Sequence, residues 1–132
     1  MMPHKHFGNA DSAITIDLDA IIANWRYIDG LSSSTTKTAA VVKANGYGLG
    51  SCMVATALAR AGCELYFVAS LAEAIELRAA FRQTGHCDLS IMVLHGIQRG
   101  QEKDFTAHQL VPVLNDLEQI SRWQFCASKT GK

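Results

Sequence analysis

The sequence lacks an excess of charge of either sign and lacks a long apolar run. Its 132 residues include twelve acidic and twelve basic side chains, and the basic residues form no stripe. A surface that follows a phosphate backbone needs such a stripe, so we expect no nucleic-acid partner. No apolar stretch approaches the roughly 18 residues that span a bilayer, so we expect no membrane association. The first residues, MMPHKHFGNADSAITIDL, lack the apolar core of a secretory signal, which predicts a cytoplasmic protein.

A metal-binding pattern is also absent. His4 and His6 form a close pair, but we interpret residues 1–12 as a flexible N-terminal tail. The four cysteines follow no CxxC or other zinc-binding spacing, and we expect them to be reduced: Cys52, Cys63, Cys87 and Cys126. The sequence therefore predicts no metal site.

Hydrophobic periodicity, by contrast, is strong, and it changes near the start of the chain. Apolar and polar residues alternate over residues 13–18, which predicts a half-buried opening strand. The apolar spacing then becomes helical up to Gly30, with Asp17 or Asp19 available as the N-cap. Residues 13–30 are therefore predicted to form a strand followed by a helix.

Four units of strand and helix follow in residues 38–132. The strands are predicted at AAVVKA, CELYFVA, DLSIMVLHG and LVPVLN. Ser51 is expected to cap the helix after the first strand, and Ser70 with Glu73 forms a capping box for the next helix. Such alternation predicts an α/β fold with a parallel sheet, either doubly wound or part of a (β/α)8 barrel. Four units cannot close a barrel of about 250 residues, so the second interpretation is half a TIM barrel with two unpaired sheet edges.

Lys43 stands at the end of the first of these strands. Function gathers at the carboxyl ends of parallel strands in both architectures. Strand alternation places Val41 and Lys43 on one face, so a barrel would direct this lysine inward among apolar walls. Partial desolvation there disfavours the ammonium form and leaves more neutral amine to attack a carbonyl and form an imine.

Three glycines follow Lys43 closely. They allow a sharp turn, and a helix that starts near Ser51 would present amide hydrogens to an anion such as phosphate. An aldehyde that carries a phosphate, such as pyridoxal phosphate, would use both features. Two other interpretations remain open at this point. Lys43 could simply extend to solvent beside an ordinary loop. The glycines could also belong to a dinucleotide fold, although their spacing is GxGxG and not GxGxxG.

The stretch VVKANGYGLG closely resembles the cofactor-lysine signature of alanine racemases, VVKANAYGHG. Three further blocks are similar to segments of that family in the same order: ITIDLDAIIANW, VASLAEAIELR and LVPVLNDLEQI. Together the blocks span about residues 14–121. The resemblance implies the N-terminal portion of a pyridoxal phosphate-dependent alanine racemase of fold type III. Its first half-barrel would be preceded by a strand that belongs to the family's second, β-rich domain.

The resemblance also implies roles for individual residues. Lys43 would form the Schiff base with pyridoxal phosphate and act as the base for the D enantiomer, and Tyr47 would contact the phosphate. A tyrosine from the partner subunit would act on the L enantiomer, so the full-length protein is expected to be a homodimer that supplies D-alanine for peptidoglycan. Val41 and Leu94 lie near predicted strand ends and are weaker candidates for lining the cavity, because core packing also explains them.

The sequence departs from the family mainly in what it does not contain. It ends before a segment that resembles HLKVDTGMGRLGF, and so lacks the later strands, the arginine that meets the pyridine nitrogen and the tyrosine base. We therefore expect these 132 residues alone to be inactive. Alternatives are a non-racemising pyridoxal phosphate-binding barrel, a broad-specificity racemase acting on serine or lysine, a related decarboxylase, and a binding module with an unmodified lysine.

Overall fold

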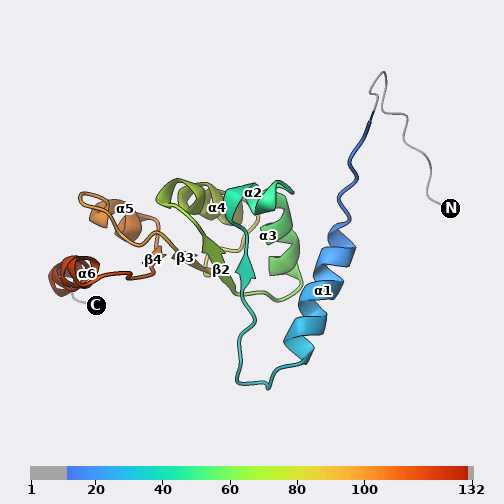
Figure 1. Cartoon of the computed structure of the whole chain (residues 1–132), viewed down its shortest axis with the longest axis horizontal. Helices are drawn as coiled ribbons and strands as arrows, with labels where there is room; N and C mark the ends of the chain where they lie inside the picture. The colour runs from blue at the N-terminus through green and yellow to red at the C-terminus, as the bar shows by residue number, and fades with distance from the viewer. Residues whose placement is uncertain (1–11, 131–132) are drawn as a thin grey trace.

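The computed structural model describes residues 12–130, with the side chains of the last two excepted. The predicted tail, with His4 and His6, lies outside the described residues apart from Ser12. The elements in chain order are α1 (Leu18–Gly30), β1 (Ala40–Val41), α2 (Lys43–Tyr47), α3 (Ser51–Arg60), β2 (Leu65–Val68), α4 (Leu71–Gln83), β3 (Ser90–Val93), α5 (Glu102–Ala107), β4 (Val111–Pro112) and α6 (Leu117–Thr130). Figure 1 shows their arrangement.

The four strands form one parallel sheet in the order β1-β2-β3-β4. A doubly wound sheet reverses its strand order at a switch point, and this sheet does not. Right-handed crossovers between sequential neighbours place the connecting helices on one face, as in a barrel. The structure therefore confirms the half-barrel and excludes the doubly wound alternative.

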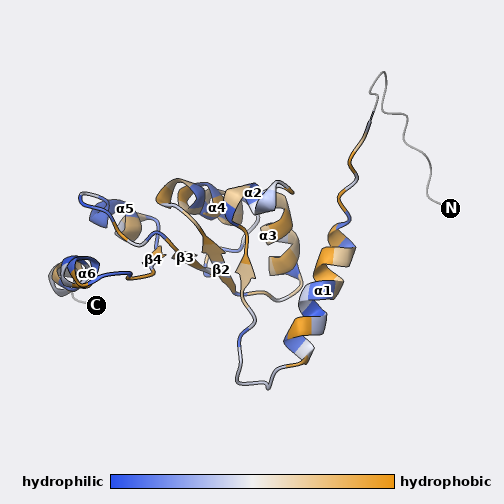
Figure 2. Cartoon of the chain, in the orientation of Figure 1, coloured by the Kyte–Doolittle hydropathy of each residue, from blue (hydrophilic) through white to orange (hydrophobic). Residues whose placement is uncertain are grey.

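The core lies between this sheet and the helices. Side chains that alternate along the strands are fully buried there, among them Tyr66 and Ile91. The ring of Tyr66 meets that of Phe81 from α4 edge to face, with centroids 4.9 Å apart. Its hydroxyl lies 3.0 Å from the Cys63 carbonyl oxygen and 3.2 Å from that of Ala55. Figure 2 shows hydrophobic residues along the strands and on much of α3.

The opposite face of the sheet is open. The strand register aligns Val41, Phe67, Met92 and Val111 in one row across it. Val41 remains 45% exposed and Val111 40%. In a closed barrel this row faces the interior, so the open face is the inner wall of half a barrel.

The predicted opening strand is the main difference from expectation. Residues 12–17 belong to no helix or strand, and Ile14 is 89% exposed. A strand needs a neighbour for its backbone hydrogen bonds, and the described sheet contains only β1–β4. The following helix is confirmed: α1 begins at Leu18, and Ala20 N donates to the Asp17 cap at 3.0 Å.

At the other end of the sheet a buried arginine joins three segments. Arg78 on α4 is 2% exposed, and its guanidinium donates only to backbone carbonyls. The acceptors, at 2.8–2.9 Å, are the carbonyls of Cys87, Leu89, His108 and Gln109, which precede β3 and β4. Burial lowers the pKa of Arg78. Nothing in the sequence pattern indicated this contact.

Candidate active site

Lys43 lies directly after β1, at the carboxyl end of the sheet. Val41 is on the open face and Val42 is 2% exposed on the helix-covered side. Val42 already has a ψ of 24°, so extended backbone ends one residue before the lysine. Strand alternation therefore does not set the direction of Lys43, which is the first residue of α2. The lysine is half-buried, and among the described residues its amine has no hydrogen-bond or ion-pair partner.

The turn after Lys43 is left-handed over consecutive residues. Ala44, Asn45 and Gly46 have φ of 51°, 53° and 64° with ψ of 40–50°, and Tyr47 has φ 54°. Left-handed backbone costs a residue with a side chain about 1–2 kcal/mol. Such a turn persists only where neighbouring groups hold it, and strained backbone of this kind is concentrated at functional sites. The sequence indicated a glycine turn but not that alanine, asparagine and tyrosine would share its conformation.

Glu73 holds the start of the turn. Its carboxylate accepts from Ala44 N at 3.0 Å and from Ala69 N at 2.7 Å, so it joins the ends of β1 and β2. The predicted capping box is confirmed on one side, since Glu73 N donates to Ser70 Oγ at 3.3 Å. In a full capping box the Glu73 carboxylate would accept from Ser70 N. Here it accepts from Ala69 N and Ala44 N instead.

Asn45 holds the end of the turn. Its Oδ1 accepts from Ser51 N at 3.0 Å, and its carbonyl accepts from Gly50 N at 2.8 Å. Ser51 is thus the first residue of α3, and the N-cap position belongs to Gly50, without a side-chain cap. The Ser51 amide, which was expected to face an anion, already has a partner. Gly46 is packed closely here: a Cβ on it would lie 3.1 Å from Ser51 N.

The remaining predicted site residues are placed at different distances along the sheet. Tyr47 shares the left-handed turn with Lys43 and is 63% exposed. Val41 ends β1 two residues before Lys43, on the open face. Leu94 is half-buried at the end of β3, with β2 between it and β1. The structure therefore groups Lys43, Tyr47 and Val41, while Leu94 lies farther along the same edge.

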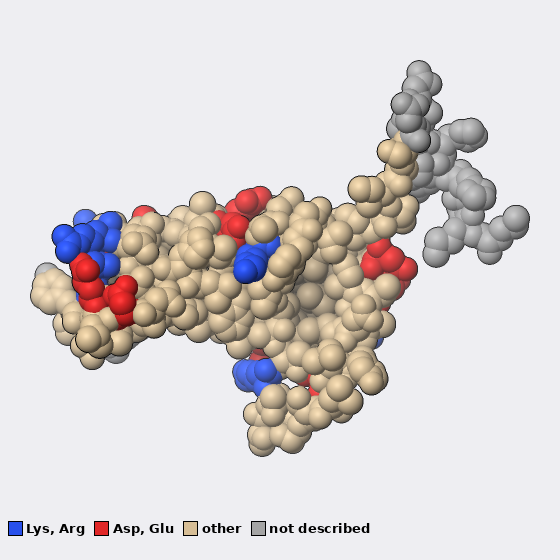
Figure 3. Space-filling view, in the orientation of Figure 1, with Lys and Arg blue, Asp and Glu red and all other residues tan. Residues whose placement is uncertain are grey.

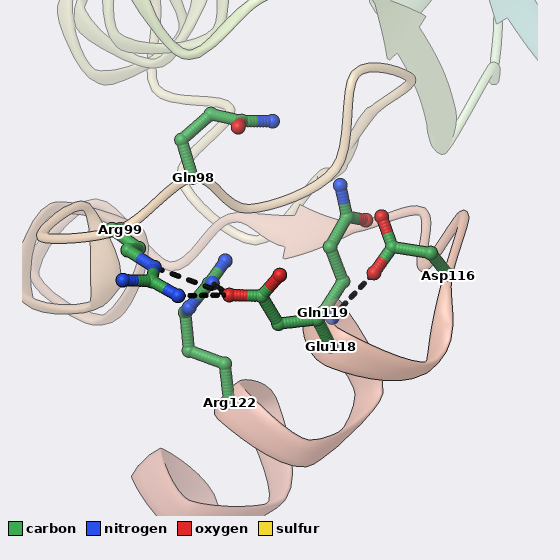
Figure 4. A pocket seen from close by; sticks show the side chains of 6 residues that line it. All are labelled: Gln98, Arg99, Asp116, Glu118, Gln119 and Arg122. Carbon is green, nitrogen blue, oxygen red and sulfur yellow. Dashed lines mark hydrogen bonds and ion pairs between the residues drawn. The ribbon is translucent and has the colours of Figure 1, made fainter.

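A charged cavity of about 440 Å³ lies farther along the chain, between the loop after β3 and the start of α6. Figure 4 shows Glu118 between Arg99 and Arg122, each with a guanidinium nitrogen 2.7 Å from Glu118 Oε1. Arg99 holds the pKa of Glu118 below its ordinary value. Arg122 also pairs with Glu102 at 3.6 Å, so two arginines and two glutamates compensate one another and the cluster fastens the loop to α6. Figure 3 shows the same mixture of signs at the α5–α6 end of the molecule.

Two other findings concern the described residues as a whole. Between residues 12 and 130, no three histidine, cysteine or acidic side chains are grouped so that they could hold a metal ion. Within the same range, every helix is too short or too polar to cross a membrane.

Comparison with known families decides between the interpretations of the lysine motif. The family described as "Alanine racemase, N-terminal domain" matches residues 16–132. The chain belongs to the alanine racemase family. The dinucleotide-fold interpretation of the three glycines is therefore wrong.

Individual alanine racemases agree with this assignment. The catabolic alanine racemase of Agrobacterium fabrum is 42% identical over 125 residues, 95% of this chain and 31% of that protein. The alanine racemase of Cereibacter sphaeroides is 44% identical over 113 residues, 86% of this chain and 31% of that protein. The chain thus spans about three-tenths of the length of these relatives.

The fold agrees with solved alanine racemases as well. The crystal structure from Bartonella henselae, which has covalently bound pyridoxal phosphate, superposes with a TM-score of 0.80 at 37% identity. The match covers 89% of this chain and 31% of that one. The structure from E. faecalis gives a TM-score of 0.72 at 31% identity over 83% of this chain and 28% of that one.

Proposed function

We propose that the intact protein interconverts L-alanine and D-alanine with pyridoxal phosphate attached to Lys43. The observation that carries the proposal is the position of this lysine in a chain of the alanine racemase family. Lys43 is half-buried and follows β1 on a turn that Glu73 and Asn45 hold in place. Lys43 has no ion-pair partner among the described residues, which leaves its amine available for the covalent attachment.

The residues around Lys43 fit a flat ring that carries an anion. Val41, Phe67 and Met92 give the open face an apolar wall beside the strand end. Tyr47 supplies a phenol hydroxyl from the same turn, and we propose that it donates to the cofactor phosphate. When bound, pyridoxal phosphate supplies an electron-accepting ring that stabilises the negative charge left at the substrate α-carbon.

Lys43 has two tasks in this proposal. Its Nζ forms the covalent attachment to the cofactor, and when released by the substrate amine it holds the α-proton on one face of the substrate. Racemisation needs a second base on the opposite face. Tyr66 does not fit this task, because burial raises its pKa and its hydroxyl is bonded within the core. We propose that the second base is a tyrosine outside residues 12–130, contributed by the partner subunit of a homodimer.

The cellular role and location are further parts of the proposal. A cytoplasmic enzyme of this activity would supply D-alanine for peptidoglycan. The Agrobacterium relative is named as catabolic, which favours the breakdown of alanine as a second candidate role. Deletion of the gene separates the two: a requirement for added D-alanine supports supply, and failure to grow on alanine as carbon source supports breakdown. Assays with serine and lysine test the broad-specificity alternative.

Covalent trapping tests the proposed attachment. The intact protein is loaded with pyridoxal phosphate, reduced with borohydride and mapped by peptide mass spectrometry. The adduct is expected on Lys43 and is expected to vanish, with the activity, in Lys43→Ala. Lys37→Ala is the matched control, because Lys37 is exposed and paired with Glu64 at 2.8 Å. An adduct absent from Lys43 would refute the proposal.

A further inference from the structure

Glu73 is the charged group that the described structure places against the lysine turn. It belongs to α4, yet its carboxylate reaches Ala44 N, 29 residues away in sequence. Ala44 is the residue after Lys43 and the first with left-handed backbone. The direction in which the chain leaves Lys43 is therefore set at an amide that Glu73 binds.

The second bond of the same carboxylate makes this contact rigid. Ala69 N lies 2.7 Å from Glu73 Oε2, so one side chain spans the ends of two neighbouring strands. The bond from Glu73 N to Ser70 Oγ fixes the residue at the start of α4. A carboxylate accepts at both oxygens, and bonds to a charged acceptor are stronger than bonds to a neutral one.

We propose that Glu73 is a positioning residue for Lys43: by holding the amides of Ala44 and Ala69, its carboxylate keeps the left-handed turn that presents the lysine amine to the aldehyde. This inference rests on the proposed attachment of pyridoxal phosphate to Lys43. Glu73 acts through the backbone and takes no part in the proton transfers.

Glu73→Gln is the sharpest variant because it keeps the shape of the side chain. The amide oxygen of glutamine accepts from one of the two backbone N–H groups, and its NH₂ group then faces the other. Glu73→Asp keeps the charge but is one methylene shorter, so it cannot reach both amides. Glu76→Gln removes an exposed carboxylate from the same helix and is the matched control.

The first measurement is hydrogen exchange in the intact protein without cofactor. Whichever of the Ala44 and Ala69 amides faces the NH₂ group is expected to exchange about 10-fold faster in Glu73→Gln than in the wild type or Glu76→Gln. Amides of β3 are expected to be unchanged. Equal exchange at both amides in all three proteins would overturn the inference.

The second measurement is the rate at which added pyridoxal phosphate is fixed on Lys43, trapped by borohydride at timed intervals. We expect a rate about 10-fold lower in both Glu73→Gln and Glu73→Asp. Asp17→Ala removes the N-cap of α1, which bonds neither Glu73 nor Ala44, so it controls for loss of stability, and it is expected to react at the wild-type rate.

The outcomes separate the inference from the proposed function. Labelling of Lys43 at equal rates in wild type and Glu73→Gln would overturn the inference and leave the proposed function intact. A slow rate in Asp17→Ala equal to that of Glu73→Gln would also overturn it, since general destabilisation would then explain both. A wild type that is not labelled at Lys43 would overturn the proposed function and the inference together.

Discussion

The Nε of Arg78 donates to the carbonyl oxygen of His108 at 2.9 Å, across 30 residues of sequence. Together with its three other carbonyl bonds, this contact fastens α4 to the segments that enter β3 and β4. It lies at the end of the sheet opposite Lys43. Residues at that end of a barrel are expected to contribute to stability and not to catalysis.

Replacing Arg78 by methionine is predicted to destabilise the intact protein strongly. Methionine fills a similar space but leaves four carbonyl oxygens without their donors, which costs about 3 kcal/mol. Arg82→Met, an exposed arginine on the same helix, is the control and is expected to change stability by less than about 0.5 kcal/mol. Urea unfolding midpoints measure both. A difference of less than about 1 kcal/mol between the variants would contradict the assigned role.

Gly96→Ala is predicted to be poorly tolerated, because a methyl group there would meet Gln119 Oε1 and lie 2.6 Å from the Val113 carbonyl oxygen. Gln119 cannot move aside freely, since its Oε1 accepts from Asn115 N at 2.9 Å. We expect a loss of more than about 2 kcal/mol. Gly100→Ala is the matched control: its φ is also positive, but a Cβ would meet nothing within 4 Å. Similar melting temperatures for the two variants would show that the contact is unimportant.

Stability is predicted to fall in alkaline solution. Burial raises the pKa of the Cys63 thiol and of the Tyr66 hydroxyl. Above about pH 9 the unfolded chain releases protons that the folded chain retains, so the free energy of unfolding decreases as pH rises. Unfolding midpoints at about pH 7 and pH 10 measure the decrease. Cys63→Ala should make this decrease smaller, whereas Cys87→Ser, at an exposed thiol, should leave it unchanged. An equal decrease in the wild type and both variants would contradict the assigned role of the Cys63 thiol.

Residues 1–132 expressed alone are predicted to show no alanine racemisation above that of free pyridoxal phosphate. The open face and the two sheet edges leave the site without its other half and favour aggregation. Chiral analysis of alanine and size-exclusion chromatography provide the measurements. Turnover that disappears in Lys43→Ala, or a monodisperse monomer that unfolds cooperatively, would disprove the respective part of this prediction.

Much of the fold could be predicted because it depends on short-range patterns. The helical spacing and a cap at Asp17 or Asp19 located α1, where the structure has Asp17, and the capping-box residues Ser70 and Glu73 located the start of α4. The predicted opening strand is not formed in the described residues for the complementary reason. The alternation of apolar and polar residues over 13–18 is typical of a segment that can join a sheet. Such a segment becomes a strand only where a neighbouring strand accepts and donates its backbone hydrogen bonds.

The amino-acid sequence by itself determined that β1–β4 alternate with helices and singled out Lys43 as the candidate lysine, because periodicity, caps and the VVKANGYGLG motif are contained within a few neighbouring residues. Only the tertiary structure decided that Glu73 binds the Ala44 amide and that Arg78 fastens two distant loops. These partners lie about 30 residues apart, and they meet only when successive units stack side by side with one register and one handedness.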